Sequence, residues 1–228
     1  MPTKKKHPII VVDNFMGETY SHRLHYNFFG PVPFPWCFIP DSTYPNRMTK
    51  EWNEQKILNP DPKDYSCSFN HMAYVKDADH KSPYYELFAP IMDNMMDLLQ
   101  ANLDFSRVRL GLHVNRQVDR LHNKPHIDNQ ADHYAALYYV NESDGDTFLF
   151  DQYDSPYSGS SQQRTEAIDK ERLTIYKRIS PKRNRLVIFD GHQVHASSEP
   201  KLFPSRIVIN FNFTADKDIF KNFKEEDN

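Results

Sequence analysis

Residues 185–195 read Arg-Leu-Val-Ile-Phe-Asp-Gly-His-Gln-Val-His, and residues 205–213 read Ser-Arg-Ile-Val-Ile-Asn-Phe-Asn-Phe. The first stretch is a short apolar run that ends in Asp-Gly, which indicates a buried strand followed by a turn. In the second stretch every second residue from Ile207 to Phe213 is Ile or Phe, which indicates a strand with two different faces. Both stretches are therefore expected to belong to a strand-rich core.

The rest of the second half has the same character. Further short apolar or alternating runs are expected strands, at 107–116, 133–141, 147–150 and 173–179. Residues 180–184, Ser-Pro-Lys-Arg-Asn, have turn chemistry and predict a hairpin between 173–179 and 185–189. Many short antiparallel strands with short connections are typical of a jelly roll or a similar barrel. The predicted class is α+β, mainly β.

The first hundred residues are interpreted as support for this core. The expected elements are strands at 9–12 and 66–75, ordered coil at 31–62, and helices at 15–29 and 83–102. Pro90 is expected to kink or split the second helix. The predicted organisation is a single domain over 1–228, made of helical and coil support with short strands (1–105), the β-helix core (106–214) and a charged tail (215–228).

Composition limits the class of protein. The chain of 228 residues is 39% hydrophobic and 26% charged, with a net charge of −3 and a pI near 6.4. This balance does not indicate a broad surface for nucleic acid or an anionic membrane. No apolar stretch approaches the roughly 18 residues of a membrane span. Cys37 and Cys67 lack the spacing of a metal site and are interpreted as free buried thiols, so a cytoplasmic setting is expected.

Three side chains form a split set of metal-type ligands. His126 and Asp128 are two residues apart, so in a strand both would project from one face. His122 and His126 have the spacing of a helical zinc pair, but Pro125 disfavours a helix there. Taken alone, His126 and Asp128 are as consistent with a simple pairing of the two side chains in a loop as with a metal site. With His195 they make two imidazoles and one carboxylate, the ligand set of non-haem Fe(II).

The polar side of the strand at 205–213 has two interpretations. Arg206, Val208, Asn210 and Asn212 share this side and could form a solvated outer face. They could instead line a pocket inside a barrel, with Arg206 and Asn210 as polar ligand contacts. An arginine suits a dicarboxylate because its guanidinium can bind a carboxylate through two hydrogen bonds. Together with the ligand set, this points to an oxygenase that uses iron, molecular oxygen and 2-oxoglutarate.

Four motifs in order resemble the iron(II)- and 2-oxoglutarate-dependent dioxygenase superfamily, and within it the prolyl-4-hydroxylase-like branch. They are HID at 126–128, LYYVN at 137–141, RLVIFDGHQVH at 185–195 and SRIVINF at 205–211. The resemblance spans residues 107–214 and implies a double-stranded β-helix. It implies that His126, Asp128 and His195 are the iron ligands, with His192 as the competitor of His195.

The same resemblance assigns the co-substrate contacts. Arg206 matches the basic residue that binds the distal carboxylate of 2-oxoglutarate, a position where collagen-type members carry lysine. Tyr139 matches a tyrosine that hydrogen-bonds this carboxylate in some relatives. With Asn210 as a third polar contact, these residues make up the predicted co-substrate site.

The activity that the resemblance implies is hydroxylation of a C–H bond in a protein side chain, proline first, with release of succinate and CO2. Ascorbate is an expected reductant. The alternatives are hydroxylation of a small free molecule, such as an amino acid, and a non-catalytic jelly-roll module that binds metal. The sequence has no basic stripe interleaved with aromatic residues, so a nucleic-acid substrate is disfavoured. Residues 151–172 form an apparent insertion, either a lid or a tolerated surface loop.

Weaker candidates surround these motifs. His133 and Asn129 could support the HID motif from nearby. Lys182, Arg183 and Arg185 could contact an acidic substrate, although a solvated turn is the favoured interpretation of that cluster.

Overall fold

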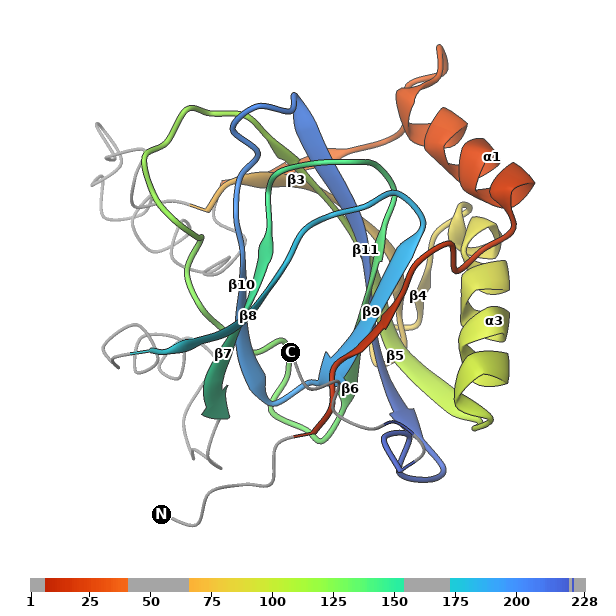
Figure 1. Cartoon of the computed structure of the whole chain (residues 1–228). Coiled ribbons are helices and arrows are strands. Elements are labelled where there is room, and N and C mark those ends of the chain that lie inside the picture. The colour runs from red at the N-terminus through yellow and green to blue at the C-terminus, as the bar shows by residue number, and fades with distance from the viewer. Residues whose placement is uncertain (1–6, 41–65, 154–172, 222, 224–228) are drawn as a thin grey trace.

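Two antiparallel sheets lie opposite each other in the computed structural model, which describes residues 7–40, 66–153, 173–221 and 223 (Figure 1). The large sheet has the order β1-β9-β6-β11-β5-β3-β2, with β4 paired to β3, and the small sheet has the order β10-β7-β8. This arrangement is a double-stranded β-helix, as predicted.

The strands of the described residues have the following bounds: β1 Ile10–Val12, β2 Cys37–Ile39, β3 Ser68–Val75, β4 His80–Lys81, β5 Leu103–Val114, β6 Tyr134–Tyr139, β7 Thr147–Tyr153, β8 Ile175–Ile179, β9 Arg185–Asp190, β10 Gln193–Ser197 and β11 Ser205–Ala215. The helical elements are α1 Glu18–Phe29, the single 3-10 turn η2 Tyr85–Leu87 and α3 Ala89–Leu99.

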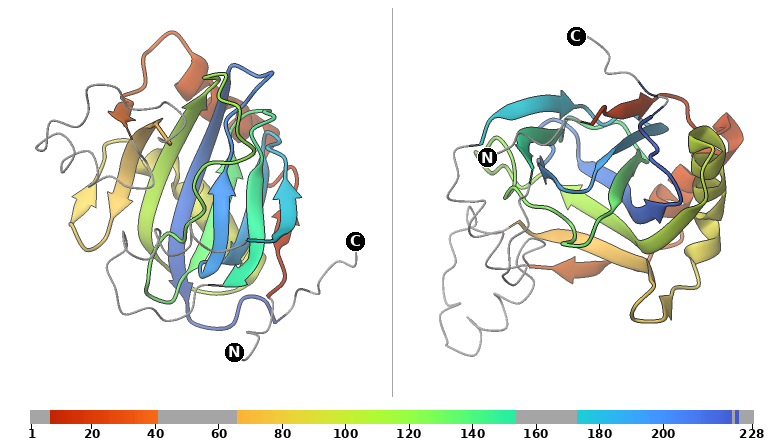
Figure 2. Two further views of the ribbon diagram at one scale, coloured as in Figure 1. Left: turned by 90° about the vertical axis from the view of Figure 1, so that its left-hand side faces the viewer. Right: turned by 90° about the horizontal axis from the view of Figure 1, so that it is seen from below.

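Helices α1 and α3 pack on the outer face of the large sheet (Figures 1 and 2). Leu24 of α1 and Met95 of α3 belong to the same buried cluster as Leu110, Ile209 and Phe211 of the sheet. A second cluster, which includes Leu137, Leu149 and Val187, lies between the two sheets. Because strand residues alternate between faces, the large sheet is covered on both sides.

The predicted helix at 83–102 is split. Ser82 starts a 3-10 turn, where its hydroxyl accepts a hydrogen bond from the Tyr84 amide at 3.0 Å, and α3 begins only at Ala89. Pro90 occupies the first turn of α3, where its missing amide donor costs nothing. The coil predicted at 31–62 is also partly wrong, because Cys37–Ile39 pair with β3 as an edge strand; Cys37 is exposed rather than buried.

The hairpin predicted over 173–189 is wrong. Strand β8 pairs with β7 in the small sheet, whereas β9 pairs with β1 and β6 in the large sheet. The turn at 180–184 therefore carries the chain from one sheet to the other. Local turn chemistry predicts where a strand ends but not which strand it then joins, because pairing is decided by burial of the two faces.

Asn184 holds this crossing in place. Its backbone is left-handed, with φ 65°. Its side-chain oxygen accepts hydrogen bonds from the Met16 amide at 2.8 Å and the Tyr138 hydroxyl at 3.0 Å. Its side-chain nitrogen donates to the Met16 carbonyl at 2.8 Å. The crossing is thus tied to the segment that leads into α1.

Replacing Asn184 by alanine is expected to lower the free energy of unfolding by about 2–4 kcal/mol, because three buried hydrogen bonds are lost. Asn184→Gly should lose nearly as much, although glycine accepts the left-handed backbone freely. Urea unfolding of both variants measures the effect. A glycine variant as stable as the wild type would show that backbone conformation, and not the side-chain bonds, governs this position.

Two further expectations concern membrane spans and the insertion at 151–172. None of the helices in the described ranges is long and apolar enough to cross a membrane. Within the expected insertion at 151–172, residues 151–153 extend β7, and the remainder lies outside the described residues.

Candidate metal centre and adjoining cavity

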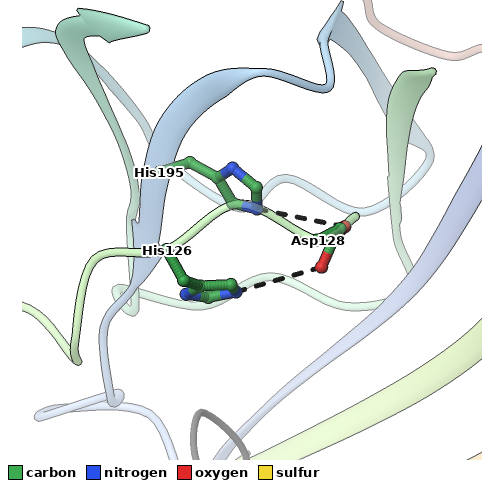
Figure 3. Close-up of side chains that lie close together, drawn as sticks. All are labelled: His126, Asp128 and His195. Atoms are coloured by element: carbon green, nitrogen blue, oxygen red, sulfur yellow. Dashed lines mark ion pairs between the residues drawn. The ribbon is translucent and has the colours of Figure 1, made fainter. Parts of the chain in front are cut away.

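The structure brings His126, Asp128 and His195 together (Figure 3). The backbones of His126 and His195 are paired by two hydrogen bonds of 2.9 Å, which set the two imidazoles side by side. One ligand atom from each residue lies within 4.8 Å of the others. Nε2 of His126 is 3.9 Å from Oδ1 of Asp128, and Nε2 of His195 is 4.0 Å from Oδ2. These side chains could hold one metal ion.

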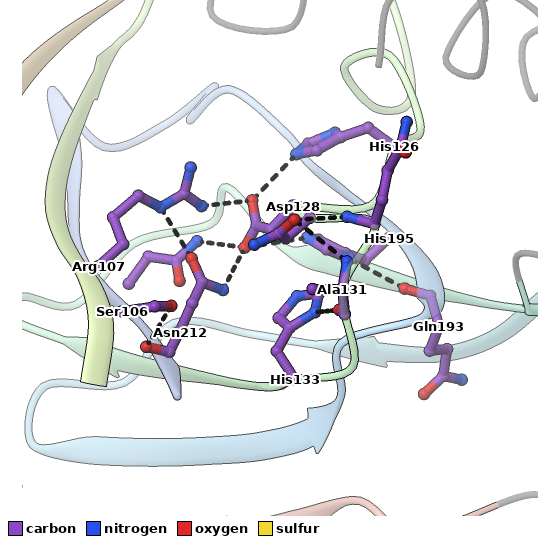
Figure 4. Close-up of polar contacts among 12 residues, drawn as sticks. Ser106, Arg107, His126, Asp128, Ala131, His133, Gln193, His195 and Asn212 are labelled. Atoms are coloured by element: carbon purple, nitrogen blue, oxygen red, sulfur yellow. Dashed lines mark hydrogen bonds and ion pairs between the residues drawn. The ribbon is translucent and has the colours of Figure 1, made fainter. Parts of the chain in front are cut away.

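The imidazoles are oriented for this role by their other nitrogens. Nδ1 of His126 lies 3.0 Å from the Lys124 carbonyl. Nδ1 of His195 lies 3.0 Å from the Gln193 carbonyl (Figure 4). Because a carbonyl only accepts, each Nδ1 must carry the proton. Each Nε2 therefore presents a lone pair towards the Asp128 carboxylate, as a metal ligand requires.

Electrostatics keep all three side chains in their ligand forms. Burial and the neighbouring His126 lower the pKa of His195 to about 4, and burial also lowers the pKa of His126. Burial opposes ionisation of Asp128, but Arg107 and the nearby imidazoles hold its pKa well below the usual value. Two neutral imidazoles and one carboxylate suit a divalent cation, so the donor set fits Fe(II).

Asp128 is held by three side chains of the large sheet (Figure 4). Asn210 and Asn212 of β11 donate to Oδ2 at 2.8 and 2.9 Å. Arg107 of β5 is paired with Oδ1 at 2.9 Å, and its Nε donates to Asn212 at 2.8 Å. Asn212 thus positions both the carboxylate and its arginine partner.

Asn212→Ala is expected to weaken metal binding by about 10–100-fold, the usual cost of losing a partner of a ligand. Titration with Co(II) by calorimetry measures this affinity. Asn102→Ala is the matched control, because Asn102 bonds the exposed Asp216 outside this site. Unchanged Co(II) affinity in Asn212→Ala would contradict the supporting role.

A cavity adjoins the three ligand residues. His126 and His195 line it, as do Arg206, Val208 and Asn210 of β11. The polar face of the strand at 205–213 therefore faces the interior, and the solvated alternative is wrong for it. Asn210 uses its nitrogen for Asp128, while its buried oxygen has no partner among the described residues.

Arg206 is a buried cation that forms no ion pair with a carboxylate of the described residues. Its side chain is 2% exposed and donates a hydrogen bond to the Thr147 hydroxyl at 2.9 Å. Its Nε has no hydrogen-bond partner within the described chain. Burial lowers the pKa of Arg206. A desolvated guanidinium of this kind is stabilised by a bound anion.

Tyr139 lies beside Arg206 and does not line the cavity. The guanidinium carbon is 5.5 Å from the centre of its ring, and the Tyr139 hydroxyl is 2.7 Å from the Thr147 hydroxyl. Thr147 lines the cavity and contacts both residues.

The weaker candidates are not among the three clustered ligand residues, although His133 lies close to them (Figure 4). His192 pairs with Asp132 at 3.1 Å and is not among the three clustered ligands. His133 bonds the Ala131 carbonyl, and Asn129 bonds the amides that follow it in the loop. The basic cluster is paired within the chain: Lys182 and Arg185 share Asp13, and Arg183 pairs with Glu18.

Sequence reasoning missed five residues of this site: Arg107, Arg109, His113, Thr147 and, as a partner of Asp128, Asn212. A signal existed on β5, where the first three alternate with Val108, Leu110 and Leu112. That alternation identifies the strand but leaves open whether its polar face meets water or a cavity.

Comparison with known proteins finds one family model that matches part of the chain. Residues 112–214 match the model of the 2OG-Fe(II) oxygenase superfamily. No curated protein matches the sequence.

Solved structures with this architecture share little sequence with the chain. The epimerase SnoN from nogalamycin biosynthesis, described as non-heme and alpha-ketoglutarate-dependent, is 9% identical with a TM-score of 0.56, over 93% of this chain and 80% of that one. An oxidoreductase of the 2OG-Fe(II) oxygenase family from Burkholderia pseudomallei is 7% identical with a TM-score of 0.56, over 90% and 85%. A Pseudomonas putida prolyl-4-hydroxylase is 13% identical with a TM-score of 0.45, over 91% and 92%. The first two similarities show a shared fold.

Proposed function

The chain belongs to the 2OG-Fe(II) oxygenase superfamily, and we propose that it hydroxylates a C–H bond of a protein side chain, with proline the first substrate to test. The observation that carries an oxygenase role is the pairing of two features in one cavity. His126 and His195 of the His-Asp-His cluster line it, and so does a buried arginine that has no carboxylate partner among the described residues. A module that only binds metal would have no use for the second feature.

His126, Asp128 and His195 would hold the Fe(II), and Arg206 would bind the distal carboxylate of 2-oxoglutarate. When bound, iron and this co-substrate supply the oxidative chemistry that releases succinate and CO2. Thr147 keeps the Arg206 guanidinium in place by accepting its hydrogen bond at 2.9 Å. Tyr139 supports Thr147 through its hydroxyl.

Succinate formation tests this proposal. Purified protein is incubated aerobically with Fe(II), ascorbate and 2-oxoglutarate, and succinate is followed by NMR with proline-containing peptides and, separately, free amino acids. We expect succinate from the wild type and none above background from His126→Ala. Stimulation by peptides supports the protein side chain, and stimulation by amino acids alone supports the small-molecule alternative.

Binding of 2-oxoglutarate provides a test that needs no prime substrate, the molecule that is hydroxylated. We expect 2-oxoglutarate to raise the melting temperature of the metal-loaded protein, because a ligand that binds only the folded state stabilises it. No shift at millimolar 2-oxoglutarate would remove the co-substrate assignment and leave the metal-binding module as the better explanation.

A further inference from the structure

Arg109 is a second arginine that faces the cavity. It lies on β5 directly opposite Asn210 of β11, and it lines the same space as His126, His195 and Arg206. Unlike that of Arg107, its side chain forms no hydrogen bond or ion pair with any residue that the structure describes. Burial lowers the pKa of Arg109 to about 10, and the neighbouring Arg107 adds to this effect. The guanidinium is therefore partly buried at the cavity and has no side-chain partner among the described residues.

The charges around the cavity do not balance. Three guanidinium groups, those of Arg107, Arg109 and Arg206, are matched by one carboxylate, that of Asp128. Two other buried carboxylates, those of Asp146 and Glu199, are already paired. Asp146 pairs with Arg178, and Glu199 pairs with Arg116 and Arg120. Among the residues that the structure describes, two positive charges are left over around the cavity.

The proposed cofactors do not remove this excess. Fe(II) adds two positive charges and the 2-oxoglutarate dianion removes two, so the count for the described part of the site stays at two positive charges. Unpaired charge in a low-dielectric site is costly. An anion from the prime substrate would offset part of this cost, and Arg109 is the cation that neither Asp128 nor the distal carboxylate occupies.

We propose that Arg109 binds a carboxylate of the prime substrate, so that the enzyme acts on an acid. This inference rests on the proposed function. In a protein substrate the acid would be an aspartate, a glutamate or a chain terminus next to the hydroxylated residue. Leu137 and Val208 line the same cavity and offer apolar surface to the aliphatic part that is oxidised.

Acetate is the probe that tests this site directly. The protein is loaded with Mn(II), which replaces Fe(II) and is paramagnetic, and with saturating 2-oxoglutarate, so that the distal carboxylate site is filled. Acetate bound close to the metal then shows enhanced relaxation of its methyl protons. We expect saturable enhancement in the wild type and at least about tenfold weaker acetate binding in Arg109→Met, the typical value of a charge-assisted hydrogen bond.

The control variants separate the possible roles. Arg185→Met, which removes an arginine paired with Asp13 outside the cavity, should bind acetate as the wild type does. The affinity of Arg109→Met for 2-oxoglutarate should stay within about threefold of the wild type, because that anion is assigned to Arg206 and the metal. A large loss of 2-oxoglutarate affinity in Arg109→Met would overturn the proposal and give Arg109 to the co-substrate. Acetate enhancement that persists in Arg109→Met would place the anion on the metal and overturn it as well.

Competition then identifies the source of the carboxylate. A capped peptide containing Pro-Asp is compared with its Pro-Asn counterpart, and free proline with prolinamide. Displacement of acetate by the acidic member of the peptide pair supports a protein substrate, and displacement by free proline alone supports a small acid. Displacement that does not depend on the carboxylate, or none at all, would overturn the substrate assignment. If the wild type fails to bind 2-oxoglutarate, the proposed function fails, and the acetate titration without it still tests Arg109.

Discussion

Replacing His195 by alanine is expected to abolish succinate formation, with a loss of more than about a hundredfold. Changes in the partners of metal ligands alone cost about 10–100-fold, and His195 is assigned a ligand role itself. Its Nε2 lies 4.0 Å from the Asp128 carboxylate, and its Nδ1 is committed to the Gln193 carbonyl. The loss is measured as the rate of succinate release at saturating Fe(II) and 2-oxoglutarate.

His192→Ala is the matched control, because this histidine lies three residues away in the same loop and strand region. Its imidazole pairs with Asp132, so it should contribute nothing to metal binding. We expect nearly wild-type succinate release and Co(II) affinity in this variant. If His192→Ala were inactive and His195→Ala active, the ligand assignment would be reversed.

Strand β11 can be predicted from the sequence because the residues on its two faces differ so sharply. Ile209 and Phe211 pack against the helices, while Arg206 and Asn210 line the cavity. Period-two alternation alone predicts the strand and separates the two sets. Which set faces the cavity is not a local property, and it was resolved only by the sheet that lies opposite.

The same limit explains what was missed on β5. Arg107, Arg109 and His113 alternate with apolar residues, a pattern that usually marks a strand with one solvated face. Here the large sheet is covered on both faces, so the polar positions point into the molecule. The change of sheet after β8 has the same origin, since strand pairing depends on distant burial and the local turn at 180–184 does not encode it.

Register connects the hydrophobic core to the site. Pairing of β11 with β5 sets Arg206 opposite His113 and Asn210 opposite Arg109. A slip of one residue would turn these side chains towards the helices and bring Ile209 into the cavity. The core that buries Ile209 and Phe211 therefore also fixes the positions of the polar groups on the other face.

Arg206→Met is expected to raise the 2-oxoglutarate concentration for half-maximal succinate formation by about 100-fold or more, from two charge-assisted hydrogen bonds of about 1.5–3 kcal/mol each. The maximal rate should fall much less, because Arg206 is assigned to binding rather than to the reacting atoms. The half-maximal 2-oxoglutarate concentration of Arg206→Lys should lie between those of the wild type and Arg206→Met. Lysine keeps the positive charge but cannot bind a carboxylate through two parallel hydrogen bonds. Initial rates over a range of 2-oxoglutarate concentrations measure both quantities.

Arg185→Met controls for the loss of an arginine as such, because Arg185 is paired with Asp13 outside the cavity. It should leave the 2-oxoglutarate requirement unchanged. Without ligand, Arg206→Met should melt no lower than the wild type, since it removes a buried charge that has no carboxylate partner in the described chain. With 2-oxoglutarate, the wild type should gain stability that the variant does not. A variant that melts far lower, yet keeps the wild-type 2-oxoglutarate requirement, would show that Arg206 serves the fold and that the anion binds elsewhere.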